Sequence, residues 1–142
     1  MTASTPRTFD SFTRGEVLPA VPLVIAADDV RAYLDATGED AARWDGRVPP
    51  VMLSALMLGV LLAQVEIPLG IMHTGQEHEA HRPVQIGEPL TIVVTVTAHS
   101  VRRGALMAAF DSEARSGDEV VAVSRTSVMV PPPGGGADGS AA

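Results

Sequence analysis

The side chains best suited to chemistry lie in the segment TGEDAARWDG, residues 37–46. It contains Glu39, Asp40 and Asp45, whose carboxyl groups can act as general acids or bases, and the only tryptophan of the chain, Trp44. An indole N–H can only donate a hydrogen bond, so Trp44 cannot accept a proton from a substrate. Acids of this kind are also ordinary in solvated turns, so a purely structural role for all three stays open.

Four histidines are the other candidate bases. His73, His78 and His81 fall in an alternating stretch, 72–82, that predicts a β-strand. Strict alternation places His73 and His81 on one face and His78 on the other, so the three do not converge on a metal ion. His73 is the best substitute base because it opens the strand after the central helix, although a structural role fits it too. His99 is expected to be exposed near a strand end.

The chain contains no cysteine, which excludes disulfides, thiolate metal ligands and cysteine nucleophiles. We therefore expect no metal and no cofactor. All ten basic residues are arginine, and seventeen acids give a net charge of −7, which disfavours nucleic acid as a partner. Arg82, Arg102 and Arg103 either keep a strand end and a turn soluble or bind phosphate, for which the forked guanidinium is suited.

The element expected to position these groups is the apolar segment VMLSALMLGVLLAQV, residues 51–65. It is too short to cross a bilayer and ends at Glu66, and a helix that is apolar on every side is usually buried. We predict a central core helix that begins at Pro49–Pro50 and buries Leu58. Gly59 within it suggests that another element packs closely against the backbone.

The rest of the chain divides around this helix, and its 142 residues fit one domain, over 11–130. Before the helix we expect a strand at 23–25 and a short amphipathic helix capped by Asp28 and ended by Gly38. Four β-like runs follow it and predict an antiparallel meander: 72–82, 89–99, 104–114 and 119–130. Residues 1–10 and the Pro/Gly-rich tail from 131 are expected to be disordered. The N-terminal stretch lacks the apolar core of a signal peptide, so we expect a cytoplasmic location and no membrane partner.

This order of elements predicts an α+β protein with the hot-dog fold, an antiparallel sheet wrapped around a buried central helix; pattern alone leaves other α+β meanders open. Over roughly residues 10–130, the sequence resembles the MaoC-like dehydratase/hydratase family, and within it the N-terminal half-domains of double hot-dog dehydratases. The resemblance is carried by DVRAYLDATGED and VPPVML, by MHTGQEHEAHRPVQIGEPL, and by the closing SVMV.

The resemblance implies that the chain binds acyl thioesters of coenzyme A or acyl carrier protein. Active members add or remove water across the α,β-bond, using the Asp and His of a T-G-D-x-N-P-x-H loop and backbone N–H groups near a helix start. Here Glu39 occupies the Asp position and Trp44 the His position, so the usual base is missing. The implied site is as follows: candidate catalytic groups Glu39, Asp40 and His73; substrate-binding groups Trp44, Val51, Met52 and Arg82.

Three functions follow from these expectations. The first is a lyase, a 3-hydroxyacyl-thioester dehydratase or enoyl hydratase with an altered catalytic pair. The second is a non-catalytic acyl-binding subunit that pairs with an intact half-domain. A hot-dog thioesterase is a weaker third, because such enzymes tend to carry a carboxylate on the central helix and residues 51–65 have none. We also expect dimerisation, with an identical chain or another hot-dog half-domain, since a single sheet leaves an exposed edge.

Overall fold

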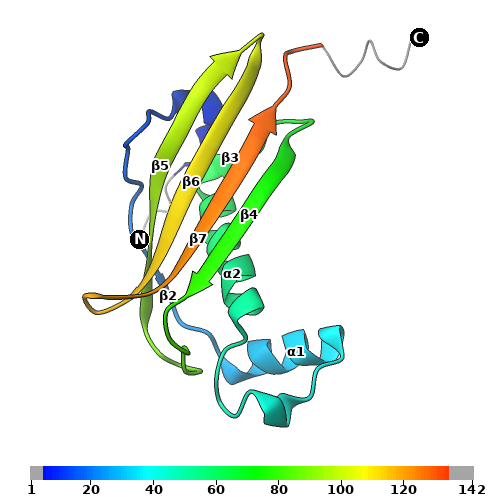
Figure 1. The fold of residues 1–142 in the computed structure, drawn as a ribbon, viewed down its shortest axis with the longest axis vertical. Helices are drawn as coiled ribbons and strands as arrows, with labels where there is room; N and C mark the ends of the chain where they lie inside the picture. The colour runs from blue at the N-terminus through cyan, green and yellow to red at the C-terminus, as the bar shows by residue number, and fades with distance from the viewer. Residues whose placement is uncertain (1–4, 135–142) are drawn as a thin grey trace.

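A computed structural model describes residues 5–134 and shows a five-stranded antiparallel sheet curled around one helix (Figure 1). This confirms the predicted hot-dog fold. The elements are β1 (Arg7–Thr8), η1 (Phe9–Ser11), β2 (Val21–Leu23), α1 (Ala27–Thr37), η2 (Ala41–Arg43), α2 (Pro50–Ala63), β3 (Val65–Glu66), β4 (Met72–Ala80), β5 (Leu90–Arg102), β6 (Ala105–Ser116) and β7 (Glu119–Val130). No helix in residues 5–134 is long and apolar enough to span a membrane.

The central helix α2 begins where the prolines predicted, with Pro49 as N-cap and Pro50 as the first helical residue. Its burial is one-sided, however, and the prediction of an all-round core helix is wrong. The buried residues of α2 are Met52, Leu53, Met57 and Leu61. Val51 is 70% exposed and Leu58 is only half-buried. A single sheet can cover only one side of a helix, so the outer side of α2 remains open.

The core forms where α2 meets the inner faces of β5, β6 and β7. Alternate residues of β5 are fully buried, as the pattern predicted, among them Ile92, Val94 and Val96. Phe110 of β6 is also fully buried and packs edge-to-face against Phe9 and Phe12. The ring centroids of Phe9 and Phe12 each lie 5.9 Å from the ring centroid of Phe110.

The start of the domain lies earlier than predicted. Residues 5–10 were expected to be disordered, yet β1 pairs in parallel with β3 and Phe9 is 4% exposed. Burial of the two N-terminal phenylalanines, Phe9 and Phe12, compensates for the entropy of ordering this segment. The expected disordered tail lies mostly in residues 135–142, outside the described residues.

The sheet order, β2-β5-β6-β7-β4, corrects the predicted meander. β5, β6 and β7 follow one another, but β4 pairs with β7 rather than with β5. Residues 81–89 therefore cross the sheet from the edge strand β4 to β5, which lies next to the other edge strand, β2. β4 contains a bulge between His73 and Gly75 that breaks the expected alternation. His73 consequently hydrogen-bonds Gln76, Nε2 to Oε1 at 3.0 Å, instead of sharing a face with His81.

Helix α1 positions the 37–46 loop. Asp28 does not cap this helix, because the N-cap is Ala26 and Asp28 lies in the first turn, 3.0 Å from the Arg31 guanidinium. The predicted stop at Gly38 is confirmed, since Gly38 takes a left-handed conformation with φ 73°. The chain then turns into η2 and reaches the start of α2.

Candidate functional site

A hollow of about 240 Å³ lies between α1, the 37–46 loop and the start of α2. It brings together three of the predicted site residues, Glu39, Trp44 and Val51. The first helical residue, Pro50, has no N–H, so Val51 and Met52 carry the first N–H groups of α2. These two groups have no partner within the helix because of its i to i−4 bonding pattern. The hollow therefore combines a carboxylate with a helix start that offers hydrogen-bond donors.

Trp44 forms one wall of this hollow and follows η2, where its backbone N–H donates to the Ala41 carbonyl oxygen at 3.1 Å. Its indole Nε1 is buried and has no hydrogen-bond acceptor among residues 5–134. Packing rather than hydrogen bonding therefore fixes the ring. Glu39 is the only carboxylate that lines the hollow, and no histidine lines it. The site thus has an acid and an aromatic wall, without a nitrogen base.

The other predicted site residues lie elsewhere. Asp40 lines none of the hollows; its Oδ1 accepts the Ala42 N–H at 3.0 Å and caps η2. Met52 is 5% exposed and belongs to the core. His73 lies at the start of β4, near the C-terminal end of α2, whereas α1 and the loop lie at the opposite end (Figure 1). The structure thus separates Asp40, His73 and the side chain of Met52 from the Glu39 hollow.

A second hollow, of about 500 Å³, lies on another side of Trp44, between the loop and the end of β4. Its lining residues are Arg43, Trp44, Arg47, Val48, Pro50, Ala80, His81, Arg82 and Pro83. Three guanidinium groups and one imidazole make it the basic hollow of an acidic protein. Of these groups, the sequence singled out only Arg82 for ligand binding. The short spacing within RWDGR, where Arg43 and Arg47 are four residues apart, is the signal that was available.

Arg82 is neutralised by two carboxylates. Its Nη2 lies 2.7 Å from Glu88 Oε2, and its Nε lies 3.1 Å from Glu119 Oε1. The hydrogen bonds from Arg82 lower the pKa of Glu88 to about 2. Arg82 also donates to the Pro83 carbonyl oxygen at 2.9 Å, so it fixes the crossing segment 81–89.

Arg43 and Arg47 have no carboxylate within 4.0 Å among residues 5–134. Arg47 Nε donates to the Trp44 carbonyl oxygen at 2.8 Å, and Nη2 donates to the Arg43 carbonyl oxygen at 3.4 Å. His81 Nδ1 lies 3.1 Å from the Val120 carbonyl oxygen, which can only accept, so Nδ1 carries the proton and Nε2 stays free. The basic hollow thus keeps unneutralised donors.

A polar network fills the space between α2, β4 and β7. Ser124 Oγ accepts from Gln76 Nε2 at 2.7 Å and lies 3.2 Å from Ser54 Oγ of α2. Thr126 Oγ1 donates to Gln76 Oε1 at 2.9 Å. On β4, the strand that carries Gln76, both ring nitrogens of His78 are buried without partners in residues 5–134. This burial lowers the pKa of His78. This network ties the edge strand β4 to the core.

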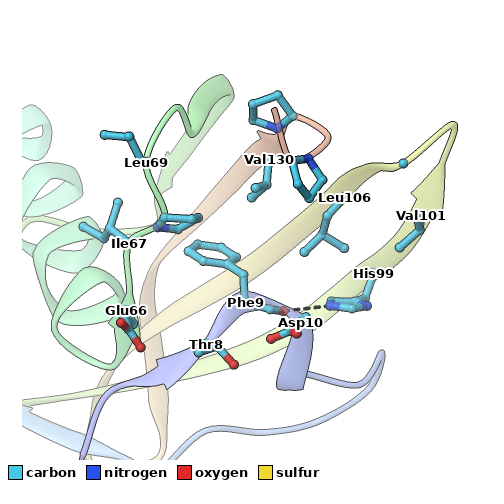
Figure 2. Close-up of a pocket in the computed structure, with 14 residues that line it drawn as sticks. Thr8, Phe9, Asp10, Glu66, Ile67, Leu69, His99, Val101, Leu106 and Val130 are labelled. Atoms are coloured by element: carbon cyan, nitrogen blue, oxygen red, sulfur yellow. Dashed lines mark hydrogen bonds between the residues drawn. The ribbon is translucent and has the colours of Figure 1, made fainter. Parts of the chain in front are cut away.

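A third hollow, of about 630 Å³, lies around β3 and the β5–β6 turn (Figure 2). These elements lie at the opposite end of the molecule from α1 (Figure 1). Its walls are mainly apolar and include Phe9, Ile67, Leu69 and Leu106. His99 lies at its rim and is half-buried, with Nε2 2.8 Å from the Phe9 carbonyl oxygen, so the expected exposed position of His99 is wrong. Glu66 and Asp10 are the acids of this hollow, and no residue of the 37–46 loop lines it.

A curled antiparallel sheet around one helix defines the class of hot-dog proteins. The chain belongs to the family described as "FAS1-like, dehydratase domain region", whose model matches residues 14–123. The resemblance to MaoC-like dehydratases and hydratases is confirmed.

Known proteins agree with this assignment. A "UPF0336 protein" from Clavibacter michiganensis is 29% identical over 136 residues, which cover 82% of this chain and 91% of that protein. The (R)-hydratase from A. caviae involved in PHA biosynthesis superposes with TM-score 0.69 at 20% identity, covering 85% of this chain and 98% of the hydratase. The HadBC (3R-hydroxyacyl-ACP dehydratase) complex from Mycobacterium tuberculosis gives TM-score 0.69 at 21% identity, covering 85% and 99%. At these identities the two structures support the fold alone.

Proposed function

We propose that this chain is an acyl-thioester-binding half-domain of the dehydratase/hydratase class that lacks the usual base and works with a second hot-dog half-domain. The observation that carries the proposal is Trp44. Its indole shares a hollow with Glu39 and the start of α2, where the active members of the class have a histidine.

The chemistry of the class explains why this change matters. Dehydration of a 3-hydroxyacyl thioester needs a base for the α-proton, an acid for the leaving hydroxyl, and donors for the thioester oxygen. Glu39 can provide a carboxyl group, and the N–H groups of Val51 and Met52 can provide donors. Trp44 provides no base, and removal of a general base costs roughly 10²–10⁴ in rate.

Pairing with another half-domain would complete the site. β4 is an edge strand, and Val51, Ala55, Gly59 and Ala63 leave an open apolar stripe on the outer side of α2. The space around Gly59 is empty within 4 Å, so the element expected to pack closely there does not come from the residues described. Exposed edges and apolar stripes favour association. Two similar folds are named as complexes, HadBC and ChsH1-ChsH2 of Mycobacterium tuberculosis.

A second candidate is a self-sufficient hydratase or dehydratase in which Glu39 alone exchanges the protons. The position of Glu39 beside the α2 N–H groups favours it. A thioesterase has less support, because α2 carries no carboxylate.

The proposal is tested with a short enoyl thioester. The purified chain should bind it, as measured by calorimetry, yet hydrate it roughly 10²–10⁴ times more slowly than an intact hydratase. The double variant Glu39→Asp with Trp44→His should gain hydratase activity. Its matched control, Glu39→Asp with Trp44→Phe, keeps an aromatic ring without a base and should gain none. Rapid turnover by the wild type that Glu39→Gln abolishes would favour the second candidate; rapid turnover that neither Glu39→Gln nor Trp44→Ala affects would refute both.

The pairing is tested separately by light scattering. A wild-type monomer at micromolar concentration would contradict a homodimer and favour a heteromeric partner. Hydratase activity should then appear when a half-domain with an intact Asp/His loop is added.

A further inference from the structure

We propose that the basic hollow beside Trp44 binds the phosphate of the carrier that bears the acyl thioester, through Arg43 and Arg47. The inference rests on the proposed function and deepens it, because it assigns the carrier end of the ligand to a particular place. It also replaces Arg82, the arginine first expected to contact substrate, with two others.

The distribution of arginines carries the argument. Five of the ten arginines form ion pairs within residues 5–134: Arg7, Arg31, Arg82, Arg115 and Arg125. Of the remaining five, only Arg43 and Arg47 line one of the hollows described above. In a chain with a net charge of −7, two unneutralised guanidinium groups in one hollow repel each other, and an anion would relieve that repulsion.

One of the two arginines, Arg47, is held in place by hydrogen bonds before any ligand binds. The Trp44 carbonyl oxygen fixes Arg47 Nε at 2.8 Å, which leaves Nη1 of the same guanidinium without a protein partner among residues 5–134. Arg43 ends η2, whose start is capped by Asp40. His81 Nε2 is a further polar atom of the hollow, because Nδ1 is engaged by Val120. Arg47 therefore loses little conformational entropy when an anion binds.

Nearby acids do not compete for this position. Glu88 and Glu119 are engaged by Arg82, and Asp40 caps η2. Asp45 follows Trp44 but is not among the residues that line the hollow. The unneutralised charge of the hollow therefore belongs to the arginines.

The position of the hollow favours the phosphate of a thioester carrier over an unrelated anion. The hollow shares Trp44 and Pro50 with the Glu39 hollow, and the open stripe of α2 starts at the neighbouring Val51. The 14 residues of α2 span about 20 Å, so a long flexible arm and an acyl chain can extend along the helix from this end. Guanidinium forks match phosphate oxygens, and Trp44 offers an apolar surface beside them.

The experiment uses the fluorescence of Trp44, the only tryptophan, as a reporter at the hollow. The probes are inorganic pyrophosphate, octanoyl-CoA, octanoyl-phosphopantetheine and octanoyl-pantetheine, which lacks phosphate. The test variant is Arg43→Gln with Arg47→Gln. The matched control is Arg102→Gln with Arg103→Gln, which makes the same change of charge at the exposed β5–β6 turn, where neither arginine lines a hollow described above. Because Arg47 also holds the loop, Arg43→Gln is measured alone, and circular dichroism verifies that each variant is folded.

We expect pyrophosphate to change the fluorescence of the wild type in a salt-dependent way. The test variant should bind octanoyl-CoA roughly 10- to 100-fold more weakly than the wild type and should bind octanoyl-pantetheine equally well. The reason is that hydrogen bonds to charged groups are lost only where the ligand carries phosphate. If the affinity for octanoyl-phosphopantetheine falls as much as the affinity for octanoyl-CoA, the arginines bind the phosphopantetheine phosphate, which CoA and acyl carrier protein have in common. Weakening of octanoyl-CoA alone supports the phosphates that only CoA has.

Other results would overturn the inference. Equal weakening by the test and control variants would show a general effect of net charge. If phosphate-bearing and phosphate-free thioesters bind equally well and pyrophosphate causes no change in fluorescence, the phosphate site would be refuted. The proposed function would remain intact. If pyrophosphate binds but none of the thioesters binds, the proposed function and the assignment to a carrier would both be contradicted.

Discussion

The ion pair between Arg82 and Glu88 should make a measurable and pH-dependent contribution to stability. Glu88 accepts from Arg82 Nη2 at 2.7 Å and from Nη1 at 3.2 Å, and its side chain is 15% exposed. Arg82 lowers the pKa of Glu88 from 4.5 to about 2. We therefore expect Glu88→Gln, which removes the charge and keeps the shape, to destabilise the fold at pH 7.

The magnitude follows from linkage. The lowering of the Glu88 pKa from 4.5 to about 2 corresponds at most to about 3.4 kcal/mol. Solvent near the partly exposed Arg82 screens the pair, so we expect about 1–2 kcal/mol, or about 3–6 °C in Tm. Because the folded pKa is lowered, the contribution is complete above pH 4.5 and is lost as the pH falls toward 2.

Urea unfolding of the wild type and Glu88→Gln between pH 7 and pH 2 measures this contribution. Glu113→Gln is the control, because Glu113 pairs with Arg115 on a more exposed surface, where little stability is expected. A difference between wild type and Glu88→Gln that stays constant down to pH 2 would refute the electrostatic explanation and indicate lost packing. A difference near zero at pH 7 would refute the structural role of the pair.

Further predictions concern the inner network and the open face of α2. Ser124→Ala should lower the free energy of unfolding in urea by about 1–3 kcal/mol, because Gln76 loses a buried partner 2.7 Å away; a loss near zero would contradict the network. Burial lowers the pKa of His78, so the unfolded chain binds a proton first, and stability should fall as the pH drops below 6.5. His78→Phe should weaken this dependence between pH 7.5 and 5.5, and an unchanged slope would contradict it. Leu58→Asp should leave a folded chain by circular dichroism but abolish dimerisation in light scattering, since Leu58 is only half-buried.

Local sequence determined much of the fold. Alternation in 89–99 predicted β5, the continuous apolar run predicted α2, and Pro50 and Gly38 marked the helix boundaries. Each of these signals comes from residues close together in the chain, where side-chain periodicity and backbone preference act directly. The altered loop was expected from the resemblance of residues 37–46 to the family's loop, and the structure places Glu39 and Trp44 in one hollow.

Contacts between distant residues were decided only by the tertiary structure. The basic hollow joins Arg43 and Arg47 to His81 because β4 ends beside the loop. Arg82 is neutralised because the crossing segment folds Glu88 back onto it and places it beside Glu119 at the start of β7. Apolarity along α2 shows that the helix must be covered, but it does not show what covers it. One sheet buries one side of a helix, so the outer side, with Val51 70% exposed, is left open.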